Sequence, residues 1–243
     1  MMKTKLFAAL ALSLTVATGA ALAAEAPQQS AGPSHWAGWY AGVNLGYSRT
    51  DDAWTDKNFF DNGSTTDHID GGGSAGLVGG YNWVKSNGLF YGAEADVNYM
   101  SNGGDTTHCP GGACDKASIQ RTAWSGYGTV RGRIGIAFDP ALVFLTAGLA
   151  AADIKDEWRP MANNSQASGI QGFAKTGISF GGVLGAGTEF AVADQVSVSL
   201  QYLYLQMLQR TADLVAPYTT PVNNGYLLND SASIFRVGVN YKF

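Results

Sequence analysis

The last eleven residues of the chain, SIFRVGVNYKF, alternate between apolar and polar side chains up to the final residue. The two phases of this alternation are Phe235, Val237, Val239, Tyr241 and Phe243, and Arg236, Gly238, Asn240 and Lys242. Successive side chains of a β-strand point to opposite faces, so this stretch predicts a strand with one oily and one polar face. Chain ends fray unless they are tied down, so a terminal strand of this kind needs a partner.

The same alternation recurs earlier in the chain, and no segment after the leader shows convincing helical periodicity. The earlier segments are residues 39–48, 74–84, 89–100, 124–138, 141–154, 178–192 and 195–205, which makes eight with the last one. Each is about as long as a tilted strand that crosses a bilayer. All 7 prolines fall between these segments, as expected because proline cannot donate to a strand ladder.

The connections between the segments alternate in length. Three are tight turns, at Ser86-Asn87-Gly88, Asp139-Pro140 and Ala193-Asp194. The other four are polar loops of about twenty residues, centred near Asp61, Cys109, Asn163 and Val222. Short periplasmic turns and long extracellular loops are typical of outer-membrane barrels.

The composition of the polar phase favours lipid over water as the outer environment. A water-soluble barrel would alternate in the same way, but its exterior would be dense in Lys and Glu. Here the polar phase is mostly Gly, Ser, Thr and Asn, which suits a narrow eight-strand interior. In hydrocarbon only helices and closed barrels satisfy the backbone, so the sequence predicts an all-β, eight-stranded antiparallel up-and-down transmembrane β-barrel.

Aromatic residues lie near the ends of the predicted strands, where they suit the girdles of a transmembrane barrel. These residues are Trp39, Tyr47, Trp83, Tyr91, Tyr99, Trp124, Phe138, Phe190 and Phe243.

The first 23 residues have the features of an export signal: a basic start, an apolar run and small residues at Ala21-Leu22-Ala23. A retained transmembrane helix is the alternative, but the apolar run is shorter than the roughly 20 residues of a span. We therefore expect a signal peptide over 1–23, a periplasmic tether over 24–37, a barrel domain over 38–243, and localisation in the cell outer membrane. Removal of the signal changes the formal net charge from −4 to −6, which argues against nucleic acid as a partner.

The charged side chains on the predicted inward face have a net formal charge of +1, so acids and bases are nearly balanced. Because an unpaired charge inside a narrow barrel is costly, we expect these side chains to pair with one another. Together with one inward amide they form the predicted lumen ion-pair network of Glu94, Asp96, Arg131, Arg133, Glu189, Gln201, Arg236 and Lys242. A narrow gated conduit is the alternative interpretation of the same residues.

Catalytic and metal chemistry have little support in the sequence. Cys109 and Cys114 are the only cysteines, and in an exported chain they predict a disulfide that closes a small loop. A metal site that uses His108 and Asp115 beside them lacks a second cluster of ligands. Asp67 and His68 are neighbours in a predicted loop and are read as solvated surface residues. We expect no enzyme activity, no metal and no cofactor.

The chain resembles the alphaproteobacterial outer-membrane immunogenic protein family, which are small surface-antigen β-barrels. The motifs that carry the resemblance occur in order over nearly all of the predicted mature chain: WAGWYAGVNLGYS, GGYNW with YGAEADVNY, TVRGRIGIAFDPALVFLTAGLA, LGAGTEFAVADQVSVSLQYLYL and FRVGVNYKF. A Glu is usual before the YLY triplet in that family, and Gln201 stands there instead. One interior ion pair of the family is therefore in question here.

The resemblance implies a non-enzymatic barrel that supports envelope integrity and is exposed as a surface antigen. It also implies a C-terminal signal for the barrel-assembly machinery, made of Phe235, Val237, Val239, Tyr241 and Phe243. The expected partners are outer-membrane lipid, lipopolysaccharide and that machinery. Two alternatives stay open: a small porin-like channel, and a surface protein whose long loops bind a host molecule or a small-molecule ligand.

Overall fold

The computed structural model describes residues 33–57, 63, 65–109, 118–161, 173–213 and 225–243. These residues form almost entirely strands, joined in one antiparallel sheet. In chain order the elements are η1 (Pro33–Trp36), β1 (Gly38–Asp56), β2 (Thr65–Val84), β3 (Leu89–His108), β4 (Ser118–Phe138), β5 (Ala141–Pro160), β6 (Phe173–Ala193), β7 (Val196–Met207), β8 (Arg210–Asp213) and β9 (Gly225–Lys242). No helix among them has the length and hydropathy that a membrane span requires.

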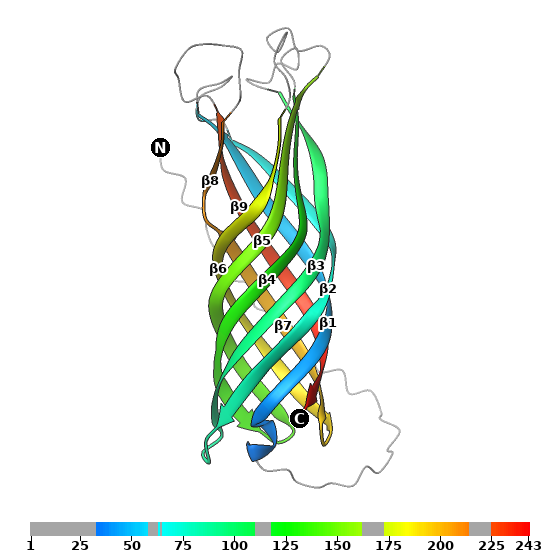
Figure 1. The fold of residues 1–243 in the computed structure, drawn as a ribbon, viewed down its shortest axis with the longest axis vertical. Coiled ribbons are helices and arrows are strands. Elements are labelled where there is room, and N and C mark those ends of the chain that lie inside the picture. The colour runs from blue at the N-terminus through cyan, green and yellow to red at the C-terminus, as the bar shows by residue number, and fades with distance from the viewer. Residues whose placement is uncertain (1–32, 58–62, 64, 110–117, 162–172, 214–224) are drawn as a thin grey trace, which may run out of the picture. The chain divides into compact units, whose positions relative to one another are not determined.

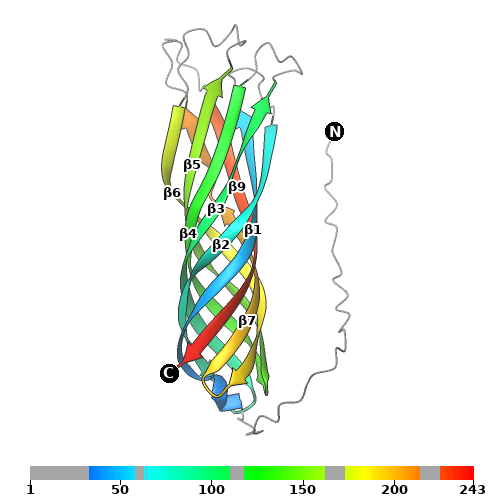
Figure 2. The same ribbon diagram turned by 90° about the vertical axis from the view of Figure 1, so that its right-hand side faces the viewer.

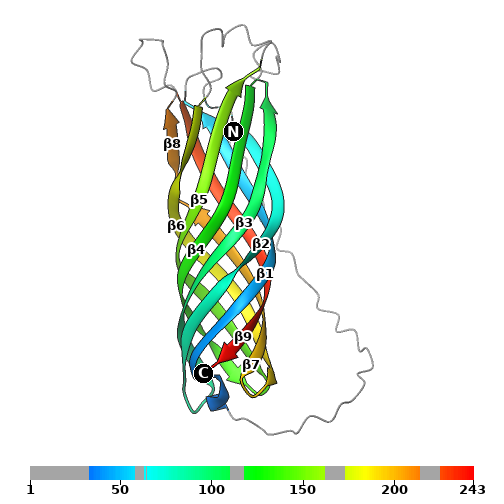
Figure 3. The same cartoon turned by 45° about the vertical axis from the view of Figure 1, so that its right-hand side comes forward.

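The sheet closes on itself, as the alternation predicted. Each strand from β1 to β7 pairs with the next, β7 pairs with β9, and β9 pairs with β1 along a ladder from Tyr40↔Lys242 to Asp56↔Tyr226. The short strand β8 also pairs with β9 and continues the line of β7 after a break at Leu208 and Gln209. The ring therefore has eight positions, and Figures 1, 2 and 3 show the strands winding around one long axis.

The predicted tight turns all lie at one end of the barrel, which we call the turn end. The chain reverses there at residues 86–88, 139–140 and 194–195. Gly88 adopts a φ of 82°, a conformation that glycine allows without steric cost. The opposite ends of the strands, at Asp56, Thr65, His108, Ser118, Pro160, Phe173 and Gly225, gather at the other end of the barrel, which we call the loop end (Figure 1).

The strands extend beyond the predicted segments at the loop end. β1 was expected to end near residue 48 but runs to Asp56, and β2 starts at Thr65 rather than 74. The first and last residues of the predicted twenty-residue loops therefore belong to strands. The prediction was wrong because the outward face turns polar there, while Asp52, Trp54 and Asp56 keep the inward phase and are buried.

An apolar belt covers the outer surface of the barrel at the turn end and middle. Its members have exposed side chains, for example Leu45 at 69% and Leu145 at 64%. Aromatic residues flank the belt as predicted, with Trp39, Trp83, Tyr91, Phe138, Phe190 and Phe243 toward the turn end and Tyr47 and Tyr99 toward the loop end. Trp124 was assigned to this girdle wrongly, since it is only 1% exposed. A β-bulge between Trp124 and Gly126 reverses the phase and turns its indole into the lumen.

The lumen is filled in layers. At the turn end η1 places Trp36 inside the barrel against Phe90, Leu142 and Phe144. A layer of charged side chains follows, and above it lies an apolar layer that includes Met100, Trp124, Tyr127, Ile154, Leu205 and Ile234. The inward glycine Gly187 makes room for one of these large groups, since a Cβ there would come within 2.6 Å of the ring of Phe144.

Candidate functional site

The charged layer at the middle of the lumen is the candidate site. Its side chains come from β3, β4, β6, β7 and β9, and all point inward because they share the phase opposite the apolar belt. The structure brings together seven of the eight predicted residues, which with Tyr40 we call the central network: Glu94, Asp96, Arg131, Arg133, Glu189, Gln201 and Arg236. Each of them is at most 8% exposed.

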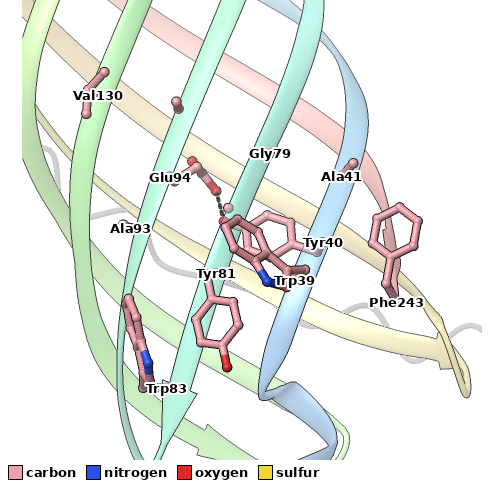
Figure 4. A pocket seen from close by; sticks show the side chains of 12 residues that line it. Trp39, Tyr40, Ala41, Gly79, Tyr81, Trp83, Ala93, Glu94, Val130 and Phe243 are labelled. Atoms are coloured by element: carbon pink, nitrogen blue, oxygen red, sulfur yellow. Dashed lines mark hydrogen bonds between the residues drawn. The ribbon is translucent and has the colours of Figure 1, made fainter.

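Glu94 is the hub of the central network. Its Oε2 accepts hydrogen bonds from the hydroxyl of Tyr40 at 2.6 Å and from Nη1 of Arg133 at 3.1 Å. Its Oε1 accepts from Arg131 and lies 3.5 Å from Nη2 of Arg236. Figure 4 shows Glu94 and Tyr40 meeting on the inner side of the wall. One carboxylate therefore joins four side chains from β1, β4 and β9.

Asp96 and Gln201 hold two arginines of the central network on its loop-end side. Oδ2 of Asp96 lies 2.7 Å from Nη2 of Arg131 and 3.1 Å from Nη2 of Arg236. The amide oxygen of Gln201 accepts from Arg236 at 2.8 and 3.2 Å. Gln201 thus hydrogen-bonds Arg236 but supplies no charge.

Arg133 links the central network to the apolar layer at the turn end. Its Nη2 lies 2.6 Å from Oε1 of Glu189. Its guanidinium also stacks over the ring of Phe144, with 3.9 Å from Cζ to the ring centroid. A planar guanidinium satisfies a carboxylate and an aromatic face at once, which a lysine does not.

Lys242 does not join the central network. Its ammonium donates to the backbone carbonyl of His35 at the turn end, far along β9 from Arg236. Without it, the central network has three carboxylates and three guanidiniums and is formally neutral. A neutral, mutually paired set gives the lumen no net field with which to select ions.

Several residues of the lumen were missed from sequence. Tyr40 belongs to the central network, and its inward phase next to Trp39 was the available signal. A second group lies at the loop end, where the buried acids Asp52, Asp156 and Asp230 surround the partly buried Arg210. These residues lie outside the predicted segments. Asp52, Asp156 and Asp230 nevertheless continue the inward-facing alternation of predicted strands, and Arg210 pairs with β9.

The remaining predicted residues lie apart from the central network. Asp67 and His68 lie in β2 rather than in a loop, and they point to opposite faces: His68 is 1% exposed inside the barrel, while Asp67 is exposed. Cys109 is disulfide-bonded, whereas Cys114 and Asp115 lie outside the described residues. Within the part of the chain that the structure describes, no group of three or more His, Cys, Asp or Glu residues is arranged to hold a metal ion.

The outer wall carries an apolar groove over β1 to β4. Its lining includes small residues such as Ala41, Gly79 and Ala93, and Val130, Trp83 and Phe243 lie at its sides (Figure 4). The groove faces outward and is continuous with the apolar belt, so it belongs to the outer surface and not to the lumen.

Residues 9–243 match the outer membrane protein beta-barrel domain family. The chain belongs to this family. Its curated relatives include the 31 kDa outer-membrane immunogenic protein of Brucella melitensis, 30% identical over 86% of this chain and 84% of the relative. The 22 kDa outer membrane protein of Rhizobium leguminosarum is 31% identical over 91% of this chain and 83% of the relative. The predicted resemblance to outer-membrane immunogenic proteins of alphaproteobacteria is confirmed.

A solved structure supports the same fold. The outer membrane protein OprG from Pseudomonas aeruginosa superimposes with a TM-score of 0.53 at 15% identity, over 87% of this chain and 98% of OprG. Together with the family match and the curated relatives, this fold shows that the protein is an outer-membrane β-barrel. By the general orientation of such barrels, the turn end is periplasmic and the loop end is extracellular.

Proposed function

We propose that this outer-membrane barrel is a closed, non-enzymatic envelope protein that supports membrane integrity and displays its loops at the cell surface. The observation that carries the proposal is the neutral central network, which fills the middle of the lumen with six paired ionic groups. Trp36 below it and the apolar layer above it add two further barriers. The names of the Brucella relatives support surface antigenicity as part of the same role.

Conductance tests this proposal against the porin-like alternative. The purified, refolded full chain is inserted into planar lipid bilayers, with a porin that forms an open channel as the positive control. A closed barrel gives no discrete current steps at any applied voltage. Regular steps that persist in independent preparations would overturn the proposal and favour a channel.

We also propose that the C-terminal residues act as the signal for the barrel-assembly machinery. Phe243 is 74% exposed and its ring lies beside that of Tyr241, with 5.4 Å between the centroids, so the ring contributes little to packing. Its backbone N–H donates to the carbonyl of Trp39, a bond that any residue can make. Because the Phe243 ring contributes little to the folded barrel, its removal tests recognition by the assembly machinery without unfolding the protein.

Phe243→Ala is expected to lower the amount of folded barrel in the outer membrane of cells several-fold, while refolding in detergent in vitro stays near wild type. The amount is measured as the heat-modifiable band in membrane fractions. Phe180→Ala is the matched control, because Phe180 is a lipid-side phenylalanine, 64% exposed, that lies on β6 outside the proposed signal. Equal membrane yields for wild type and Phe243→Ala would contradict the assignment.

A further inference from the structure

A cluster of buried acids lies inside the extracellular end of the barrel, which we call the loop-end cluster: Asp52 on β1, Asp156 on β5 and Asp230 on β9. Each of the three residues is 0% exposed. Asp52 and Asp230 are cross-strand partners, five residues beyond the outward pair Tyr47↔Phe235 that marks the upper edge of the belt. The cluster therefore lies outside the membrane-spanning segments, at the seam where the first and last strands close the barrel.

Four of the six carboxylate oxygens of the cluster accept hydrogen bonds from neighbouring side chains. Asp156 accepts from the hydroxyl of Thr122 at 3.2 Å and from Nη1 of Arg210 at 2.8 Å. Oδ2 of Asp230 accepts from Nη2 of Arg210 at 2.6 Å and from its Nε at 3.1 Å. Oδ1 of Asp52 accepts from the indole Nε1 of Trp124 at 3.0 Å.

Two oxygens are left, and they belong to the two acids that face each other. Oδ2 of Asp52 and Oδ1 of Asp230 receive no donor from any residue that the structure describes. The two residues are cross-strand partners with buried side chains, so their unsatisfied carboxyl groups are neighbours inside the barrel. An ionised carboxylate only accepts hydrogen bonds, so the two acids can satisfy each other only if one of them holds a proton. Two buried carboxylates that share a site cannot both ionise without a large cost.

The surroundings do not supply enough positive charge to replace that proton. The charged and titratable groups that face the pair are Asp156 from β5, Arg210 from β8 and His68 from β2. Burial lowers the pKa of His68, so its imidazole is neutral near pH 7. Three fully buried carboxylates therefore face one guanidinium, that of Arg210, whose side chain is 17% exposed.

We propose that Asp52 and Asp230 form a buried proton-binding site, with one proton held between Asp52 Oδ2 and Asp230 Oδ1, that fastens the extracellular end of the β1–β9 seam. The ligand is a proton rather than a metal ion, because the described residues around the pair offer no third free carboxylate or imidazole in ligating geometry. The site makes closure of the outer end of the barrel sensitive to pH.

The direction of the pH dependence follows from the site. Burial, aided by the charge of Asp230, raises the pKa of Asp52 to about 9 in the folded barrel, whereas a free aspartate has a pKa of about 3.9. The folded state holds the proton through this interval and the unfolded state does not. The contribution to stability is thus complete below about pH 4, falls as the pH rises toward about 9, and is constant above that.

Infrared spectroscopy of the folded full chain in detergent detects the proton directly. We expect a protonated carboxylic acid C=O band at pH 7 that disappears as the pH is raised through about 9. Asp156, whose pKa burial raises to about 6, is mostly ionised at pH 7 and so does not account for the band. Absence of a protonated carboxyl band from wild-type protein at pH 7 would overturn the proposal whatever the variants do.

Asp52→Asn assigns the band to the pair. The asparagine amide supplies a permanent N–H donor to Asp230, so we expect the pH 7 band to vanish and the fall in urea midpoint between pH 5 and pH 9 to flatten. Asp51→Asn is the matched control, because Asp51 is the exposed neighbour on the same strand. A band that survives Asp52→Asn, or a wild-type midpoint that follows added Na⁺ or Ca²⁺ and not pH, contradicts a shared proton.

Discussion

Glu94→Ala is expected to lower the free energy of unfolding of the barrel by about 3–5 kcal/mol, because it leaves buried guanidiniums without their shared partner. The central network would change from formal neutrality to +1. Arg131 and Arg236 would keep Asp96, and Arg133 would keep Glu189, so the barrel should still fold. The free energy is measured by urea titration of the protein refolded in lipid vesicles.

Asp105→Ala is the control for this prediction. Asp105 pairs with Arg121 at 3.2 Å on the surface, where both side chains are at least 40% exposed. Exposed pairs contribute only about 0–1 kcal/mol. If Glu94→Ala costs no more than Asp105→Ala, the central network is not a buried, desolvated set of ion pairs and the lumen must admit water.

Leu145→Arg is expected to destabilise the barrel in lipid by about 2–4 kcal/mol, the cost of a cation near the middle of the lipid-facing surface. Leu145 is 64% exposed and lies at mid-height of the apolar belt on β5. The same urea titration in vesicles reports the loss. In a water-soluble barrel this substitution would place a charge in water and change stability little.

Leu208→Arg makes the same chemical change at a different depth. Leu208 is 68% exposed and lies at the break between β7 and β8, beyond the exposed aromatic Tyr204. Near the interface the expected cost is about 0–1 kcal/mol. Equal costs at Leu145 and Leu208 would mean that the belt does not span a hydrocarbon layer.

The sequence predicted the barrel because one rule, period-two alternation, determines both the strand faces and the need for closure. The same rule placed Glu94, Arg131 and Arg236 inside the lumen, since a residue's phase along a strand decides its face. It could not predict which charged residues pair, because pairing depends on the register between strands. Gln201 and Arg236, for example, meet only because β7 and β9 align them as partners.

The errors have local causes. Trp124 was predicted to face outward because the residues after it alternate regularly, and nothing in that alternation indicates the bulge between Trp124 and Gly126. Asp52 and Asp230 were assigned to loops because the outer face becomes polar beyond the membrane, which removes the contrast that alternation needs. Lys242 shares the inward phase of Arg236 but lies at the periplasmic rim, a difference in height that phase alone does not encode.

We expect the outward side chains of the strands to contact lipid and the inward side chains to seal the lumen. Nitroxide labels at Leu145 and Lys155, introduced as cysteines in a Cys109→Ser/Cys114→Ser background, test this expectation on the same outward face of β5. In vesicles we predict that the label at Leu145 is accessible to oxygen and shielded from a water-soluble nickel complex, and that the label at Lys155 shows the reverse. A label at Leu145 that collides freely with the nickel complex would contradict the account.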